Sequence, residues 1–190
     1  MLSVFKPTSG IFQSAVNRSG IFRREARCEP VPPERFRRAM GCFASGVTVV
    51  TAAAEGELAG LTANAFSSVS LEPPMVLVCV DRRARSQDII RRAGRFAVHI
   101  LTSDQEEVAR QFARPGPEKF DDLVWSWGAD GSPRLDRCLA RLSCRLSAVH
   151  AGGDHTIFVG AVEALDTEEQ PAAPLTYFQG RLGALRLGHA

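Results

Sequence analysis

The sequence predicts a mainly β domain, a small antiparallel barrel with a few helices at its periphery. Two observations support this prediction. Short runs rich in strand-forming residues recur along the chain between turn residues, whereas helical spacing of apolar residues occurs in few segments. Two long runs, 139–150 and 155–165, are joined by a Gly-Gly-Asp turn, which is typical of a hairpin and therefore of antiparallel pairing.

Composition and charge indicate one globular domain. The chain has 190 residues, of which 45% are hydrophobic, enough for a continuous core without disulfides or a structural metal. Its 23 basic and 21 acidic residues leave a formal net charge of +2, far from the balance of a dedicated nucleic-acid-binding protein. Local arginine clusters, such as Arg35, Arg37 and Arg38, are typical of solvated faces.

The cysteines and the apolar runs indicate the cellular compartment in which we expect the protein. The 5 cysteines lack CxxC spacing, so neither a disulfide framework nor a zinc knuckle is indicated. No apolar run approaches the roughly 18 residues of a spanning helix, and the start lacks the order of a secretory signal. We expect a soluble, cytoplasmic protein without nucleic-acid or membrane partners. Since no histidines or carboxylates have ligand spacing, no metal site is expected.

The predicted domain organisation is an N-terminal arm followed by the barrel. Residues 1–30 carry scattered apolar side chains without a sustained period and predict an arm or flexible tail. The barrel domain is expected to span 31–190. Its first element is a helix whose apolar face we expect to join the core. That face consists of Phe36, Ala39, Met40 and Phe43.

The remaining elements follow from turn residues and periodicity. Predicted strands are 46–52, 58–70, 73–81, 95–101, 139–150, 155–165 and 174–185. The continuous run Val76–Val80 predicts burial on both faces of its strand. A helix over 86–94 is predicted with Ser86 as its N-cap, and a helix over 103–113 with a capping box of Ser103 and Glu106.

Familiar catalytic signatures are absent from the chain. No GxGxxG follows a strand, and GxxxxGK[ST], HExxH and GxSxG do not occur. The stretch 60–74 instead crowds small and hydroxylated residues where strands usually place bulk. It is either a wet, surface-facing strand or a platform on which a flat ligand lies close to the backbone.

The segment Asp81–Ile90 is the second candidate. Arg82, Arg83 and Arg85 precede the predicted helix that begins at Ser86, and free amides with a helix dipole and arginine suit a phosphate. An ordinary capped helix beside a solvated basic loop is the alternative. The succession of small polar strand, buried strand, basic loop and helix N-terminus is more specific than either segment alone.

From about Glu34 to Leu185 the chain resembles the flavin reductase-like family with the FMN-binding split barrel, specifically the small reductase component of two-component flavin monooxygenases. The motifs that carry the resemblance are FRRAMGCFASGVTVVTA, GLTANAFSSVSLEPPMVLVCVDRRARS, KFD, GGDHTIFVGAV and PLTYFQGRLG. The resemblance implies a homodimeric split β-barrel that reduces FMN or FAD with NADH or NADPH and delivers reduced flavin to a separate oxygenase.

The resemblance also implies a flavin site. The isoalloxazine would be lined by Thr62, Ala63, Asn64 and Ala65. Ser68 and Ser70 would lie toward the ribityl chain and phosphate, and Cys79, Val80 and Asp81 would touch the flavin from the adjoining strand. Arg85 and Ser86 would hold the phosphate, and Lys119 with Phe120 would close the far side. Ala65 departs from the serine that is common in the family, which puts one hydrogen bond in doubt.

His155 lies in the GDH motif, and the resemblance implies that it faces the nicotinamide side of the flavin. It would be the catalytic residue that seats the dinucleotide, with Asp154 orienting the turn. The alternative is a turn histidine that caps a hairpin, since glycine-Asx turns need no ligand. Hydride transfer itself requires mainly that the two reacting atoms be held within about 3 to 3.5 Å.

Two other functions remain open from the sequence. A flavin-binding relative would pass electrons to another acceptor, such as a ferric chelate or a protein. A non-enzymatic module would use the arginines near Arg35 and Arg82 to meet a nucleic acid or a protein surface. The choices between FMN and FAD, and between NADH and NADPH, also remain open.

Overall fold

The computed structural model describes residues 30–116, 118–168 and 172–185. The predicted arm, 1–30, therefore lies almost wholly outside the described residues. The helices are α1 (Pro33–Gly41), α2 (Ser86–Ala93) and α3 (Glu106–Ala113). The strands are β1 (Ser45–Gly46), β2 (Thr48–Ala54), β3 (Glu57–Ala63), β4 (Phe66–Leu71), β5 (Pro74–Asp81), β6 (Arg95–Ile100), β7 (Trp125–Trp127), β8 (Pro133–Leu135), β9 (Ala140–Gly152), β10 (His155–Thr167), β11 (Leu175–Phe178) and β12 (Arg181–Ala184).

The main sheet is antiparallel and curls into a split barrel, as predicted. Its seven strands follow the order β3-β2-β6-β9-β10-β5-β4. The strands β9 and β10 form the predicted hairpin, in which Gly153 takes φ 69° at the turn. The two edge strands, β3 and β4, are consecutive in the chain and meet at the corner Asn64-Ala65, where the Cys79 amide donates to the Ala65 carbonyl at 3.0 Å.

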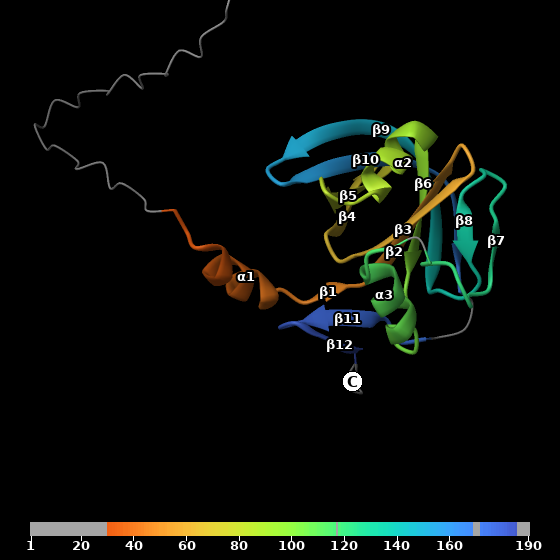
Figure 1. The fold of residues 1–190 in the computed structure, drawn as a ribbon. Helices are drawn as coiled ribbons and strands as arrows, with labels where there is room; N and C mark the ends of the chain where they lie inside the picture. The colour runs from red at the N-terminus through yellow and green to blue at the C-terminus, as the bar shows by residue number, and fades with distance from the viewer. Residues whose placement is uncertain (1–29, 117, 169–171, 186–190) are drawn as a thin grey trace, which may run out of the picture. The chain divides into compact units, whose positions relative to one another are not determined.

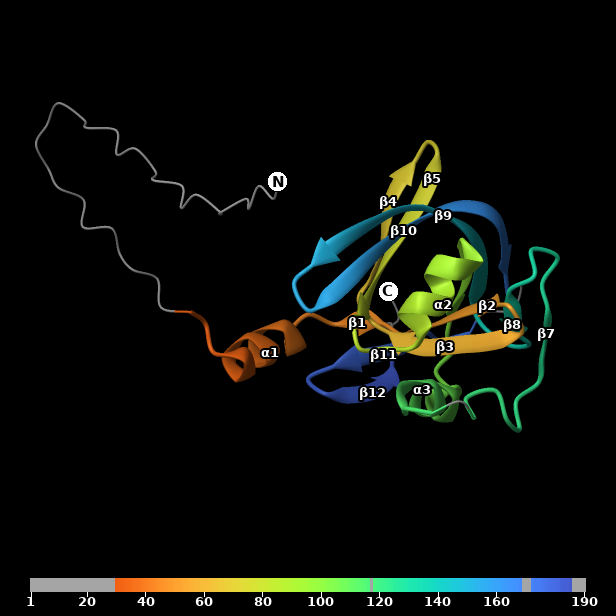
Figure 2. The same ribbon diagram turned by 45° about the horizontal axis from the view of Figure 1, so that its top comes forward.

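The helices α2 and α3 lie on opposite sides of β3 (Figures 1 and 2). Strand β2 packs beneath both helices, because its residues are buried on both faces of the sheet. Val50 and Ala52 belong to a cluster with Ile89 and Ile90 of α2, whereas Val47 and Val49 belong to a second cluster beneath α3. The neighbouring β3 therefore has a fixed position between two packed layers.

Helix α1 forms, but the prediction that it joins the core is wrong. None of its residues is buried, and Phe36 and Met40 are 60% and 50% exposed. Phe43, which follows the helix, is 72% exposed. The core of the described residues is already filled by strand side chains together with α2 and α3. The helical spacing correctly indicates an apolar face, but the described residues do not cover that face.

Three strand predictions also need correction. Residues 174–185 form two strands, β11 and β12, because Gln179 and Gly180 turn the chain at positive φ. The segment 58–70 is broken at Asn64-Ala65 into β3 and β4. Strand β5 is not buried on both faces in this chain: Val76, Val78 and Val80 are buried, whereas the alternate residues are only half-buried.

Both predicted helix caps are wrong. Arg85 occupies the N-cap position of α2 with helical dihedrals, φ −54° and ψ −33°, so Ser86 is already inside the helix. Helix α3 begins at Glu106 with Gln105 at the cap. Thr102 donates its backbone N–H to Gln105 Oε1 at 3.0 Å, so the contact lies before the helix and does not involve Ser103. In the described part of the chain, no helix is long and apolar enough to cross a bilayer.

Candidate functional site

A cleft of about 880 Å³ lies along β3. The N-terminus of α2 and the end of β5 border it, and so do the end of α3 and the segment that follows. Eleven of the residues predicted from the sequence line the cleft. They are Thr62, Ala63, Asn64, Ala65, Cys79, Asp81, Arg85, Ser86, Lys119, Phe120 and His155. Residues far apart in the sequence are thus brought to one place.

Four predicted residues do not line the cleft. Val80 is 1% exposed and lies in the core, because alternation along β5 turns it away from Cys79 and Asp81. Ser68 and Ser70 lie on β4, beyond the corner at Asn64-Ala65, and pair with the start of β5. Asp154 lies next to the cleft in the β9–β10 turn. This placement does not support the predicted flavin contacts of Ser68, Ser70 and Val80, whereas Asp154 is predicted to orient the turn, where it lies.

Small side chains on β3 bring the helix α3 close to the cleft. A Cβ atom at Gly60 would lie 2.2 Å from Phe112 Cε1, so only glycine fits there. Thr62 Oγ1 donates to the Ala109 carbonyl of α3 at 2.6 Å. Since a hydroxyl has one hydrogen, Thr62 retains only acceptor capacity toward a ligand. This hydrogen bond holds α3 against β3 beside the cleft. The role was not predicted from the sequence.

Lys119 holds the segment after α3 against strand β3. Its Nζ donates to the carbonyls of Gly60 at 2.9 Å and Phe112 at 3.0 Å. Burial lowers the pKa of this amine. The ring of Phe120 packs edge-on against Phe112 with a centroid separation of 5.2 Å. Lys119 therefore still has one N–H to donate into the cleft, from a fixed position.

The other end of the cleft is suited to an anion. Helix α2 starts there, and its N-cap residue, Arg85, provides no side-chain cap for the first turn. The positive end of the helix dipole therefore lies beside the buried Ser86, which lines the cleft, although the Gln87 N–H is already bonded to the Ala84 carbonyl. Arg85 also lines the cleft, although its Nη2 donates to Glu57 Oε1.

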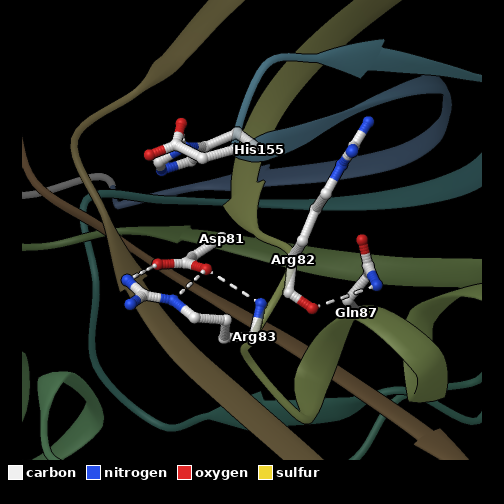
Figure 3. Close-up of polar contacts among 6 residues, drawn as sticks. Asp81, Arg82, Arg83, Gln87 and His155 are labelled. Carbon is white, nitrogen blue, oxygen red and sulfur yellow. Dashed lines mark hydrogen bonds and ion pairs between the residues drawn. The ribbon is translucent and has the colours of Figure 1, made fainter.

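Asp81, Arg83 and His155 form the mouth of the cleft (Figure 3). Asp81 Oδ2 pairs with Arg83 Nη2 at 2.7 Å, and Oδ1 accepts the Arg83 backbone N–H at 2.8 Å. These hydrogen bonds hold the pKa of the Asp81 carboxyl well below its usual range. Arg82 points away from this pair, toward the other side of the strand.

His155 is the first residue of β10 and lies opposite Asp81 in the strand register. Its Nδ1 is 2.8 Å from Asp154 Oδ1, and its side chain is 42% exposed. The hydrogen bond lowers the pKa of Asp154, which is therefore ionised at neutral pH. A carboxylate accepts only, so Nδ1 is the protonated nitrogen and Nε2 is available to a ligand.

Sequence reasoning missed several residues of the cleft. Phe112 is not among the predicted site residues, and Arg83 is predicted only as one of the basic residues that precede the helix beginning at Ser86. Arg114 carries no signal of its own and Gly60 carries only one, because their places depend on how α3 packs on β3. The isolated glycine inside a strand was the one available hint of a close approach.

The structure combines a split barrel with a cleft that runs along β3 and is lined by the first residue of α2. Residues 40–186 match the flavin reductase-like domain family. The match covers most of the chain, and the chain belongs to this family.

Individual relatives extend the match. The chain is 37% identical over 153 residues to the reductase subunit HsaB of a flavin-dependent monooxygenase from Rhodococcus jostii, covering 80% of this chain and 78% of that protein. It is 41% identical over 148 residues to the FMN reductase (NADH) SmoA of Agrobacterium fabrum, covering 78% and 83%.

Solved structures agree with the sequence relatives. The Streptomyces globisporus NADH:FAD oxidoreductase SgcE6, in complex with NAD and FAD fragments, superimposes with a TM-score of 0.76 at 37% identity. The superposition covers 84% of this chain and 97% of that one. The predicted family and the predicted fold are confirmed.

Proposed function

We infer that this protein is an NADH-dependent flavin reductase that supplies reduced flavin to a separate monooxygenase component. Two facts together support the inference. The chain belongs to the flavin reductase-like family, and eleven of the predicted site residues line one cleft. The net reaction joins NADH, oxidised flavin and a proton to give NAD⁺ and the two-electron-reduced flavin. A bound flavin supplies the hydride-accepting ring.

The cleft fits a flavin at both ends. The small side chains of Thr62, Ala63 and Ala65 leave room for a planar ring near the backbone, and Lys119 offers a donor from the segment after α3. At the other end, the N-terminus of α2 and Arg85 suit a phosphate. FMN and FAD share this half of the molecule, and we propose that both are accepted, with NADH as donor.

An anaerobic reduction tests the proposal. A catalytic amount of the protein, mixed with NADH and an excess of FMN, should bleach the flavin absorbance with one NADH consumed per flavin. The same mixture without protein is the control. A bleached amount no larger than that of the protein itself would show a bound flavin that does not turn over, and would contradict delivery of reduced flavin to a partner.

His155 is proposed to seat the nicotinamide, with Asp154 as the residue that positions its ring. We expect His155→Ala to lower kcat/KM for NADH by about tenfold, because the nicotinamide is then no longer held in a fixed position relative to the flavin. The Kd for FMN should stay within about twofold. Steady-state NADH oxidation and quenching of flavin fluorescence measure the two quantities. His150→Ala, an exposed histidine outside the cleft, is the matched control. An equal loss of flavin binding would contradict this role.

We further propose that the protein is a homodimer. The apolar residues Phe36, Met40 and Phe43 are at least half exposed, and Met75 and Leu77 on the outer face of β5 are half-buried in the single chain. The run Val76–Val80 has the composition of a strand covered on both faces, which a second subunit would provide. Light scattering at micromolar concentration should give twice the mass of 20.6 kDa; the monomer mass would contradict the proposal.

A further inference from the structure

Glu57 binds two arginines at the phosphate end of the cleft. Its Oε1 accepts from Arg85 Nη2, and its Oε2 accepts from Arg92 Nη2. A second carboxylate, Glu55, lies 3.7 Å from Arg92 Nε. Of these four side chains, only Arg85 lines the cleft. The cation expected to meet a phosphate is therefore already engaged by an acid of this chain.

The charges of this cluster cancel. Two guanidinium groups face two carboxylates, and the hydrogen bonds from Arg85 and then Arg92 hold the pKa of Glu57 below its usual range, so that it is ionised at neutral pH. An anion that approaches Arg85 meets no net positive charge from the cluster. Its attraction to this end of the cleft is correspondingly weakened.

The ion pair between Arg85 and Glu57 is also exposed enough for Arg85 to exchange Glu57 for another anion. The Arg85 and Glu57 side chains are 61% and 38% exposed. Exposed ion pairs contribute little free energy, because water and salt screen them. A guanidinium carries five N–H donors, so Arg85 has others to offer to a phosphate while it leaves or shares Glu57. The arrangement therefore permits a carboxylate and a phosphate to compete for one guanidinium.

We propose that Glu57 competes with the flavin phosphate for Arg85 and thereby keeps flavin loosely held, as an exchangeable substrate. This proposal rests on the proposed flavin reductase function. Release of reduced flavin is part of that function, and a fully available arginine at the phosphate would oppose it. Glu57 thus acts through Arg85, as a residue that tunes affinity without touching the flavin ring.

The test compares two flavins that differ only in the phosphate. For Glu57→Gln we expect the Kd for FMN to fall by about three- to tenfold, while the Kd for riboflavin stays unchanged, because an additional net positive charge acts only on the phosphate. The KM for FMN should fall in parallel, and the FMN affinity should depend more steeply on salt concentration. Fluorescence quenching at several salt concentrations measures both affinities.

Two further variants locate the effect. Glu163→Gln removes the same charge from a surface pair with Arg145, where the atoms lie 2.7 Å apart, and should leave FMN binding unchanged. In an Arg85→Ala background, Glu57→Gln should no longer tighten FMN binding, because the competed cation is absent. Thermal unfolding of each variant establishes that it is folded.

Several outcomes would overturn the proposal. These are FMN binding that weakens or does not change in Glu57→Gln, a riboflavin affinity that shifts as much as that of FMN, or an effect that persists without Arg85. If the wild-type protein neither binds FMN nor oxidises NADH in its presence, the proposed function fails instead. If wild-type turnover is normal and only the Glu57 effect is missing, the function stands and this proposal falls.

Discussion

Lowering the pH from 7 to 4 is expected to reduce the free energy of unfolding by about 3 kcal/mol through His99 alone. This histidine is 0% exposed. Its Nδ1 donates to the Val49 carbonyl at 3.1 Å, and its Nε2 accepts the Leu135 backbone N–H at 3.2 Å. Burial lowers its pKa from 6.5 to about 4, so the folded protein holds the neutral ring.

The sign follows from the unfolded chain, in which the same ring takes up a proton near pH 6.5. Below that pH the unfolded state binds more protons, and stability falls until the folded-state pKa near 4 is reached. The bond accepted at Nε2 joins β8 to β6, and protonation of Nε2 breaks it. Above pH 6.5 the contribution is fully present.

Denaturant unfolding at closely spaced pH values measures this dependence. His99→Asn retains a donor and an acceptor without a titrating ring, and is the matched variant. We expect its stability to change less than that of the wild type between pH 6.5 and 4, by an amount close to the predicted loss. Parallel curves for the two proteins would show that His99 does not carry the effect.

Gly60→Ala is expected to destabilise the protein by about 3 kcal/mol and to weaken flavin binding at the same time. The added Cβ would lie 2.2 Å from Phe112 Cε1 and 2.4 Å from Cδ1. The ring is 0% exposed and packs against Phe120, so moving it away from the added Cβ would disturb this packing. This clash can be relieved only by a shift of α3 or of β3, and both border the proposed flavin site.

Thermal and denaturant unfolding give the stability, and fluorescence quenching gives the Kd for FMN. Gly183→Ala is the control, because a Cβ there meets nothing within 4 Å in the described structure. The double variant Gly60→Ala with Phe112→Leu should recover part of the lost stability, since the shorter side chain removes the contact. A Gly60→Ala protein as stable as the wild type would contradict the close packing of α3 on β3.

The fold was largely predictable because its main signals are local. Alternation and turn residues located β9, β10 and the turn at Gly153, and the apolar run located β5. The helix caps failed because they depend on the dihedral angles at Arg85 and on the contact between Thr102 and Gln105, which no spacing rule contains.

The candidate site was predictable where residues match motifs of the family that the sequence resembles, but not at Val80, which alternation along β5 turns into the core. The pairing of Arg85 with Glu57 was not, since these residues come from different elements and meet only when α2 packs beside β3. The exposed face of α1 shows a related limit. Periodicity identifies an apolar face at Phe36 and Met40, but it does not say whether this chain or a second one covers that face.

The central claim is that this chain oxidises NADH only when a flavin is supplied. The most direct test follows the loss of NADH absorbance with purified protein and FMN, FAD or no added flavin, and repeats the series with NADPH. We predict rapid oxidation of NADH with either flavin, slower oxidation of NADPH, and almost none without flavin. Flavin that binds, as fluorescence quenching would show, without any oxidation of either nicotinamide would contradict the assignment as a reductase.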